Sequence, residues 1–292
     1  MQFETQEFGV AVRGVNLLNA PKEQIEAIKE RLYQDRAVII KGQDITAADF
    51  CDIAHKFGQP VPYLQSNYHH PEHPLIFVSS NVKRDGKTMG VARTGGYWHS
   101  DTSFEKDPKF ITMLMPKVLP KNFARSTRFI DMAAVYRALP AAIKRRLAGR
   151  EFMHTGKMRY KVRTQDAGYD IFEILATIDK LCPAVRHPAV IEHPYTKEKV
   201  LYGNRGFTLS IADASLDESA SLLKEIFDFA ETPRFVKEVQ WSMGDVIIWD
   251  NRFLGHTSGR NEGLEEETMM YRITLQDGMP LCASQINSKV AA

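Results

Sequence analysis

The stretch GGYWHSDTSF, residues 95–104, places a histidine and an aspartate two positions apart in a segment whose flanks are strand-like. Successive side chains of a strand point to opposite faces, so His99 and Asp101 are expected to project together. Trp98 and Ser100 would point to the other face. The stretch therefore predicts a β-sheet that carries two candidate metal ligands on one face.

Strand-like runs recur on both sides of this stretch, from Leu75 onward, and helical periodicity interrupts them at 132–147, 170–178 and 217–229. Many β segments with few covering helices favour a mainly β fold, a sandwich or jelly-roll core with helical decoration. A parallel α/β sheet would alternate strands and helices regularly. The runs are LIFVSSNV, FITMLMPKV, TRFIDM, AVIEHP, KVLYGN and DVIIWDN.

The N-terminal part predicts two helices around a buried strand. After Pro21, apolar residues at helical spacing indicate a first helix, and AVIIKGQ then reads as a strand. Thr46 can cap a second helix and Gly58 can end it. With no internal repeat or low-complexity linker, we expect one domain over 1–292. The polar, basic and glycine-punctuated segment 149–168 is a candidate lid or insert.

Bulk composition excludes several classes of protein. The chain has 292 residues, 43% hydrophobic and 25% charged, and its formal charge of +2 does not favour nucleic-acid or anionic-membrane partners. No window reaches the ~18 apolar residues that a membrane span needs. The three cysteines have no CxxC spacing, which suits a reducing compartment. We expect a cytoplasmic protein; its oligomeric state, a homo-oligomer included, stays open.

A third metal ligand is available in GDVIIWDNRFLGHTSG, where His256 follows an apolar strand. Two histidines and one carboxylate describe the facial triad of non-haem iron(II) oxygenases, although a catalytic zinc site can use the same set. His69, His70 and His73 lie in a proline-rich loop without a carboxylate or cysteine at ligand spacing. We expect structural or surface roles for these three.

A candidate anion-binding residue follows in MMYRITL, where Arg272 alternates with Tyr271 and Ile273 on a predicted strand. Burying its guanidinium in a cavity would cost free energy unless a carboxylate forms a bidentate pair with it. An arginine that faces solvent from an edge strand is the simpler alternative.

Taken in order, several motifs resemble the taurine dioxygenase family of iron(II)/2-oxoglutarate-dependent oxygenases: AVIIKGQDI, WHSD, STRFIDM, HPAVIEHPYTKEKVLY, GDVIIWDNRFLGH and YRITL. The resemblance implies a double-stranded β-helix (jelly-roll) core and a reaction that uses Fe(II), 2-oxoglutarate and O2. It also implies that His99, Asp101 and His256 bind iron, and that Thr127 and Arg272 hold the far carboxylate of 2-oxoglutarate. A carboxylate at position 101 disfavours halogenation, because related halogenases have a small residue there.

Within that family, FVSSNV, GKTMGVARTGGYWHSD, RFIDM and YKVR look most like the isonitrile synthases that act on N-carboxymethyl 3-amino fatty acids. This resemblance implies a small-molecule carboxylate substrate, converted to a 3-isocyano acid by oxidative decarboxylation in natural-product biosynthesis. Lys161 and Arg163 match the segment that contributes to holding the substrate, although a basic run is also typical of a solvated surface. Tyr63, Tyr68 and Tyr97 are expected beside the substrate.

Three alternatives remain at the level of the sequence. The same site could serve a hydroxylase or desaturase of another small amino or carboxylic acid. The ligand set also suits a zinc hydrolase. A metal-free binding module with the same fold would keep Arg272 without a bound metal ion.

Overall fold

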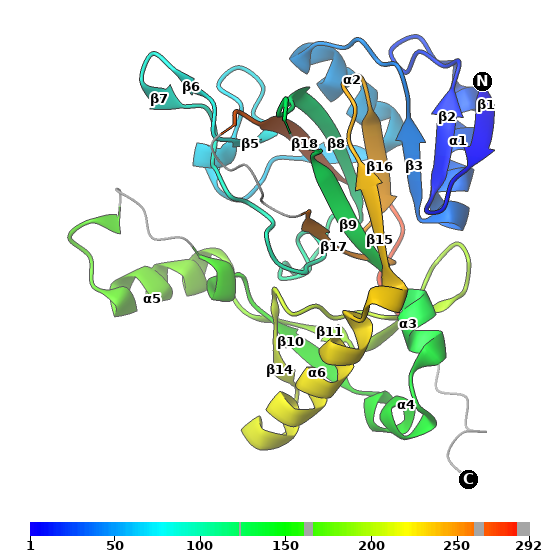
Figure 1. Cartoon of the computed structure of the whole chain (residues 1–292). Helices are drawn as coiled ribbons and strands as arrows, with labels where there is room; N and C mark the ends of the chain where they lie inside the picture. The colour runs from blue at the N-terminus through cyan, green and yellow to red at the C-terminus, as the bar shows by residue number, and fades with distance from the viewer. Residues whose placement is uncertain (123, 161–165, 260–265, 285–292) are drawn as a thin grey trace.

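The computed structural model describes residues 1–122, 124–160, 166–259 and 266–284. Its largest sheet has eight strands in the order β1-β2-β3-β16-β8-β18-β4, and β5 also pairs with β18 (Figure 1). All of these pairings are antiparallel except the one between β2 and β3. The strands are β1 (Gln2–Thr5), β2 (Val10–Arg13), β3 (Ala37–Ile40), β4 (Gln59–Val61), β5 (Phe77–Ser80), β8 (Ile111–Val118), β16 (Val246–Asp250) and β18 (Met269–Gln276).

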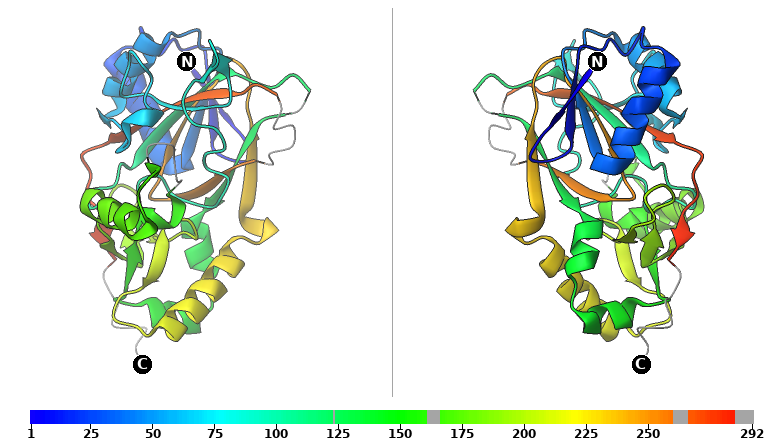
Figure 2. Two further views of the ribbon diagram at one scale, coloured as in Figure 1. Left: turned by 90° about the vertical axis from the view of Figure 1, so that its left-hand side faces the viewer. Right: turned by 90° about the vertical axis from the view of Figure 1, so that its right-hand side faces the viewer.

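Alternating side chains of the large sheet enter two separate hydrophobic cores, as the period of a strand requires. Val38 and Ile40 pack with helices α1 (Lys22–Asp35) and α2 (Ala47–Phe57), whereas Ala37 and Ile39 belong to the core on the opposite face. The two helices thus cover one face of the sheet (Figure 2). The other face is left to form the wall of a cavity.

A second sheet, β15-β9-β17, completes that cavity. Its strands are β15 (Val236–Gln240), β9 (Ser126–Asp131) and β17 (Leu254–Ser258), all antiparallel. The central cavity is lined by Leu114 and Arg272 from the large sheet, and by Thr127 and His256 from the second sheet. The two sheets therefore face each other across the site.

Most of the remaining elements form the lower part of the molecule in Figure 1, whereas a two-stranded hairpin at residues 83–88 lies at its upper left. One hydrophobic cluster contains residues of the lower helices and of β3 and β16, so the two parts share a core. The other strands are β6 (Lys83–Arg84), β7 (Lys87–Thr88), β10 (Glu151–His154), β11 (Val185–Pro188), β12 (Val190–Glu192), β13 (Lys199–Leu201), β14 (Thr208–Ile211) and β19 (Cys282–Ala283). The other helices are α3 (Met132–Ala138), α4 (Ala141–Leu147), α5 (Ile171–Leu181) and α6 (Leu216–Ala230), with short 3-10 turns η1 (Ser66–Tyr68), η2 (Gly156–Arg159) and η4 (Pro233–Phe235).

The mainly β fold with covering helices is confirmed, and two local predictions need correction. The expected helix over 132–147 is two helices, because Leu139 precedes Pro140 and has an extended backbone. Residues 95–104 are not a strand: His99 forms one isolated bridge, to His256, and Asp101 begins a turn. The helix predicted between Thr46 and Gly58 is confirmed as α2, and Thr46 forms a capping box with Asp49.

The segment expected as a lid or insert begins with β10, the middle strand of the small sheet β11-β10-β14. Phe152 and His154 of this strand are buried. After it, η2 lines the cavity, and residues 161–165 lie outside the described part of the chain.

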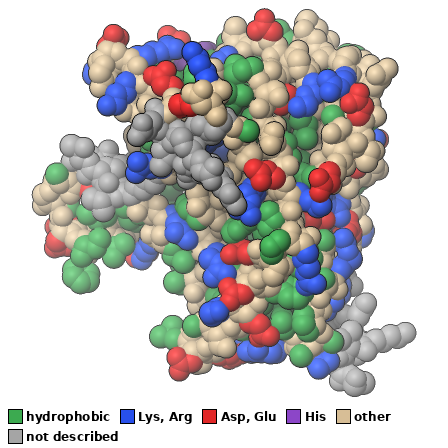
Figure 3. Space-filling model, viewed as in Figure 1, with side chains coloured by type: hydrophobic (Ala, Val, Ile, Leu, Met, Phe, Trp, Pro, Cys, Tyr) green, Lys and Arg blue, Asp and Glu red, His purple; other side chains and the backbone are tan. Residues whose placement is uncertain are grey.

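The surface of the described residues carries mixed charge and one apolar projection. Acidic and basic side chains are interspersed over the face shown in Figure 3, and apolar atoms gather at its left, where α5 lies. Tyr169, Ile171 and Phe172 around the start of α5 are exposed, whereas Ile174 and Ile178 further along the helix are buried. Within the described ranges, no helix is long and apolar enough to span a membrane.

Candidate active site and metal centre

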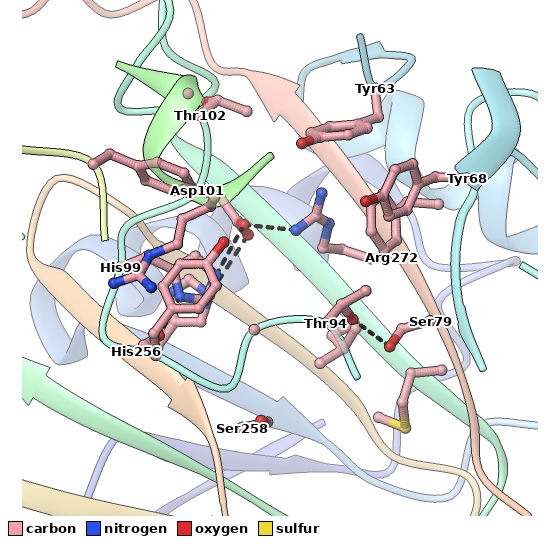
Figure 4. A pocket seen from close by; sticks show the side chains of 18 of the residues that line it. Tyr63, Tyr68, Ser79, Thr94, His99, Asp101, Thr102, His256, Ser258 and Arg272 are labelled. Carbon is pink, nitrogen blue, oxygen red and sulfur yellow. Dashed lines mark hydrogen bonds and ion pairs between the residues drawn. The ribbon is translucent and has the colours of Figure 1, made fainter. Parts of the chain in front are cut away.

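His99, Asp101 and His256 converge at the cavity, with one potential ligand atom from each within 4.8 Å of the others (Figure 4). Nε2 of His99 lies 3.7 Å from Oδ1 of Asp101, and Nε2 of His256 lies 3.7 Å from Oδ2. The backbones of the two histidines exchange hydrogen bonds of 2.9 and 2.7 Å. This bridge fixes His99 against β17, and the following turn brings Asp101 to the same point.

Both histidines are held in the neutral form that metal binding requires. Nδ1 of His99 donates a hydrogen bond to the Tyr97 carbonyl at 2.7 Å, which leaves the Nε2 lone pair free to accept a metal ion. Burial lowers the pKa of His99, and burial together with the neighbouring His99 lowers the pKa of His256 to about 3. Neutral imidazoles at neutral pH follow from both shifts.

Asp101 is ionised despite its burial. Burial would raise the pKa of this carboxyl, but Arg272 and the two histidines outweigh it and lower the pKa to about 2. Nη1 of Arg272 donates to Oδ1 at 2.6 Å, and the hydroxyl of Thr112 donates to Oδ2 at 2.8 Å. A buried carboxylate between two neutral imidazoles is the donor set that divalent iron takes up. The residues present fit the metal ion.

The metal site lies in a cavity of about 150 Å³, and nine of its 27 described lining residues are Phe, Tyr or Trp. Tyr63, Tyr68 and Tyr97, predicted to lie beside the substrate, all line it. Tyr68 stacks on Phe77 at 4.6 Å between ring centroids, and Tyr63 meets both rings edge-on. These rings line part of the cavity with apolar surface.

Arg272 and Thr127 line the same cavity. Arg272 lies on β18, an interior strand between β8 and β5, and its side chain is only 14% exposed, so the solvent-facing alternative is wrong. Its guanidinium lies 4.1 Å above the Phe77 ring. Thr127 lies on β9, where its hydroxyl accepts a hydrogen bond from Nε1 of Trp241 at 3.0 Å.

Two further arginines line the cavity, and the sequence interpretation missed both. Arg125 lies two positions before Thr127, and burial lowers its pKa. Arg159 of η2 stacks on Tyr97 at 4.2 Å and donates from Nε to the Gly206 carbonyl. Arg159 belongs to the basic run GKMRYKVR, in which the sequence indicated only Lys161 and Arg163 as substrate-binding residues. Alternation before a strand could have indicated Arg125, because 125 and 127 share a face.

Lys161 and Arg163 lie outside the described residues, so the structure does not place them. The histidines of the proline-rich loop form no metal site in the described part of the chain. Nε2 of His69 contacts the Tyr63 carbonyl at 2.7 Å, and Nδ1 of His70 accepts from the backbone of Glu72. These contacts agree with the predicted structural roles.

The two facing sheets and the buried His-Asp-His triad define a non-haem metal oxygenase. The chain matches the taurine catabolism dioxygenase TauD, TfdA family over residues 3–274 and belongs to that family. It is therefore a 2-oxoglutarate-dependent dioxygenase, an oxidoreductase that uses Fe(II), 2-oxoglutarate and O2. This family membership argues against the zinc-hydrolase and metal-free alternatives.

Relatives of known activity act on diverse molecules. The chain is 25% identical to pentalenolactone F synthase of Streptomyces arenae over 277 residues, 92% of each chain. It is 28% identical to the α-ketoglutarate-dependent 2,4-dichlorophenoxyacetate dioxygenase of Burkholderia sp. (strain RASC) over 250 residues, 81% of this chain and 80% of that protein.

Solved structures share the fold. A taurine dioxygenase from Burkholderia xenovorans has a TM-score of 0.75 at 23% identity, covering 99% of this chain and 97% of its own. AAD-2 in complex with Mn(II) and N-oxalylglycine has a TM-score of 0.79 at 23% identity, covering 96% and 99%.

Proposed function

We propose that this dioxygenase converts an N-carboxymethyl 3-amino acid into a 3-isocyano acid by oxidative decarboxylation. The proposal rests on the motifs FVSSNV, GKTMGVARTGGYWHSD and YKVR together with the charge of the cavity. We further propose that the two facing sheets are the double-stranded β-helix core that the family resemblance implies, since both sheets line the cavity.

The observation that carries the substrate class is the excess of arginine in the cavity. The described lining residues include three arginines, Arg125, Arg159 and Arg272, but a single carboxylate, Asp101. With a divalent metal ion, the positive charges outnumber the negative ones by four. Uncompensated charge in a buried cavity is costly, so the site favours 2-oxoglutarate together with an anionic substrate. 2-Oxoglutarate is a dianion, and the two carboxylates of the proposed substrate outweigh the charge of its protonated amine.

The residues divide the binding task between the two ligands. Thr127 and Arg272 would hold the far carboxylate of 2-oxoglutarate, with Arg125 as a further cation on the side of Thr127. Arg159 and the tyrosines would orient the substrate so that its CH₂ next to nitrogen faces the metal site. When bound, Fe(II) with 2-oxoglutarate and O2 supplies the oxidising power, and 2-oxoglutarate becomes succinate and carbon dioxide.

The overall conversion removes four electrons from the substrate. R–NH–CH₂–COO⁻ becomes R–N≡C, and the carboxylate leaves as carbon dioxide. Two molecules of O2 accept these four electrons, together with the four that are released as two equivalents of 2-oxoglutarate become succinate and carbon dioxide. A single hydroxylation or desaturation consumes one equivalent and keeps all substrate carbons. Stoichiometry therefore separates the proposed reaction from the hydroxylase or desaturase alternative.

The test uses protein loaded anaerobically with Fe(II) and 2-oxoglutarate, then exposed to O2 with a panel of N-carboxymethyl 3-amino acids of different chain length. Mass spectrometry should show loss of the carboxyl carbon and two succinates for each product. A product that retains every substrate carbon with one succinate would replace isonitrile formation by hydroxylation or desaturation. Oxidation of none of the panel would remove this substrate class.

A further inference from the structure

The WDNR segment, residues 249–252 at the end of β16, has no role in the reaction described so far, yet its asparagine lies at the metal site. Asn251 is buried, and its side chain reaches the loop of Asp101, the strand β8 and the neighbouring Trp249 at once. All of these contacts are with neutral groups, because Asn251 contacts Asp101 through its backbone nitrogen. Which atoms can donate and which can accept determines the direction of each hydrogen bond in this network.

The orientation of the Asn251 amide follows from its partners. Nε1 of Trp249 and the backbone nitrogen of Asp101 lie 2.9 and 3.3 Å from one end of the amide, and both groups can only donate. That end is therefore the carbonyl oxygen, Oδ1. The Nδ2 end then donates to the hydroxyl of Thr112 at 2.8 Å and to the Lys109 carbonyl at 3.3 Å.

The direction of the next hydrogen bond is forced as well. The Thr112 hydroxyl accepts from Asn251, so its only proton is available for Oδ2 of Asp101, 2.8 Å away. The ionised carboxylate can only accept, which matches the proton that Thr112 offers. Trp249, Asn251, Thr112 and Asp101 thus form a chain in which every donor meets an acceptor.

We infer that Asn251 is a positioning residue for the metal-binding carboxylate, acting directly on the backbone of Asp101 and through Thr112 on its side chain. Asp101 lies on a turn and not on a strand, so no ladder of backbone hydrogen bonds holds it in place. Asn251, the residue directly after β16, supplies that restraint. These hydrogen bonds hold the Asp101 carboxylate in one rotamer before the metal ion binds, which lowers the free-energy cost of forming the metal site.

The test measures metal binding and is independent of the substrate. Mn(II) is titrated into the full chain and followed by electron paramagnetic resonance, and Co(II) absorption reports the coordination geometry. Asn251→Ala and Thr112→Val should each weaken Mn(II) binding about 10- to 100-fold, the usual effect of removing a partner of a metal ligand, and should alter the Co(II) bands. Thr112→Ser, which keeps the hydroxyl, should retain wild-type binding.

Gln43→Ala is the matched control, because Gln43 is another buried amide that bonds to Leu17 and Val15 away from the site. It should destabilise the fold without changing Mn(II) affinity. If Asn251→Ala fails to fold, the nearly isosteric Thr112→Val still decides. Wild-type affinity and Co(II) bands in a folded Thr112→Val would overturn the inference. Failure of the wild type to bind Mn(II) would instead contradict the proposed function.

Discussion

Arg272 donates from Nη1 to Oδ1 of Asp101 over 2.6 Å, so a guanidinium lies directly against the candidate metal-binding carboxylate. The Phe77 ring lies 4.1 Å from this guanidinium, and the buried Nε has no hydrogen-bond partner among the described residues. Part of the planar donor edge is therefore left for an anionic ligand. Arg272 connects the metal site with the binding of a carboxylate.

Arg272→Leu is expected to raise the 2-oxoglutarate concentration needed for half-maximal turnover by about 10- to 150-fold. A hydrogen bond to a charged group contributes about 1.5–3 kcal/mol, and each 1.4 kcal/mol is tenfold in affinity. Succinate formation over a range of 2-oxoglutarate concentrations measures the effect. Affinity for the primary substrate should fall less.

Arg125→Leu serves as the comparison, because Arg125 lies on the side of the cavity that carries Thr127. If Arg272→Leu leaves the 2-oxoglutarate requirement unchanged while Arg125→Leu raises it, the assignment is wrong. The far carboxylate would then belong to Thr127 and Arg125, and Arg272 would face the substrate.

His99→Ala and His256→Ala should each abolish Mn(II) binding and turnover while the fold is retained. Both imidazoles line a cavity, so their removal leaves no new void in the packed core. Metal titration and circular dichroism check the two halves of this prediction. Full activity in either variant would exclude the His-Asp-His triad as the metal site.

Lys161→Met and Arg163→Met should each weaken substrate binding by about 1.5–3 kcal/mol, the scale of a hydrogen bond to a charged group. This prediction comes from the sequence alone. Substrate-independent decay of 2-oxoglutarate should persist, because the metal site is unchanged. If both residues hold one carboxylate, the double variant should lose less than the two single losses combined.

Lys180→Met is the control for those variants, since it removes an exposed positive charge from α5. If the substrate titrations coincide for Lys161→Met, Arg163→Met and Lys180→Met, Lys161 and Arg163 do not bind the substrate, and the basic run is a solvated surface segment. Arg159→Met, tested beside them, should weaken substrate binding if the described part of the run contributes.

Arg252→Met should reduce the free energy of unfolding by about 3–5 kcal/mol, because it leaves two buried carboxylates without their cation. Arg252 contacts Asp250 at 3.3 Å and Asp277 at 2.8 Å, all with side chains at most 1% exposed. Urea unfolding measures the loss. The exposed Arg205→Met, which also removes a two-carboxylate ion pair, should cost at most about 1 kcal/mol; equal losses would contradict the argument.

The same cluster predicts acid sensitivity. Burial would raise the pKa of Asp250, but Arg252 and the hydrogen bond with His193 outweigh it and hold the pKa below its ordinary value of 3.8. The stability from this lowered pKa is fully present above pH 3.8 and is lost as the pH falls toward the folded-state pKa. Unfolding free energies below pH 5 should therefore fall less steeply for Asp250→Asn than for the wild type. Identical slopes would exclude Asp250 as a contributor.

Much of the fold and of the metal site could be predicted from the sequence because the signals are local. Four of the strand-like runs correspond to β5, β8, β9 and β16, and Thr46 caps α2 as expected. The order of the motifs indicated which histidines and which aspartate belong together. The strand expected at 95–104 was nevertheless wrong. The alternating pattern assumes an extended backbone, whereas the backbone turns at Asp101.

The sequence by itself determined the strand pattern, the helix starts and the identity of the His-Asp-His triad, because these depend on neighbouring residues and on ordered motifs. Only the tertiary structure decided that a bridge to His256 and a turn, not a strand, bring Asp101 to the metal site. It also decided that Arg125 and Arg159 face the cavity and that Asn251 holds Asp101. Such contacts join residues up to about 150 positions apart, and their geometry depends on how the two sheets pack.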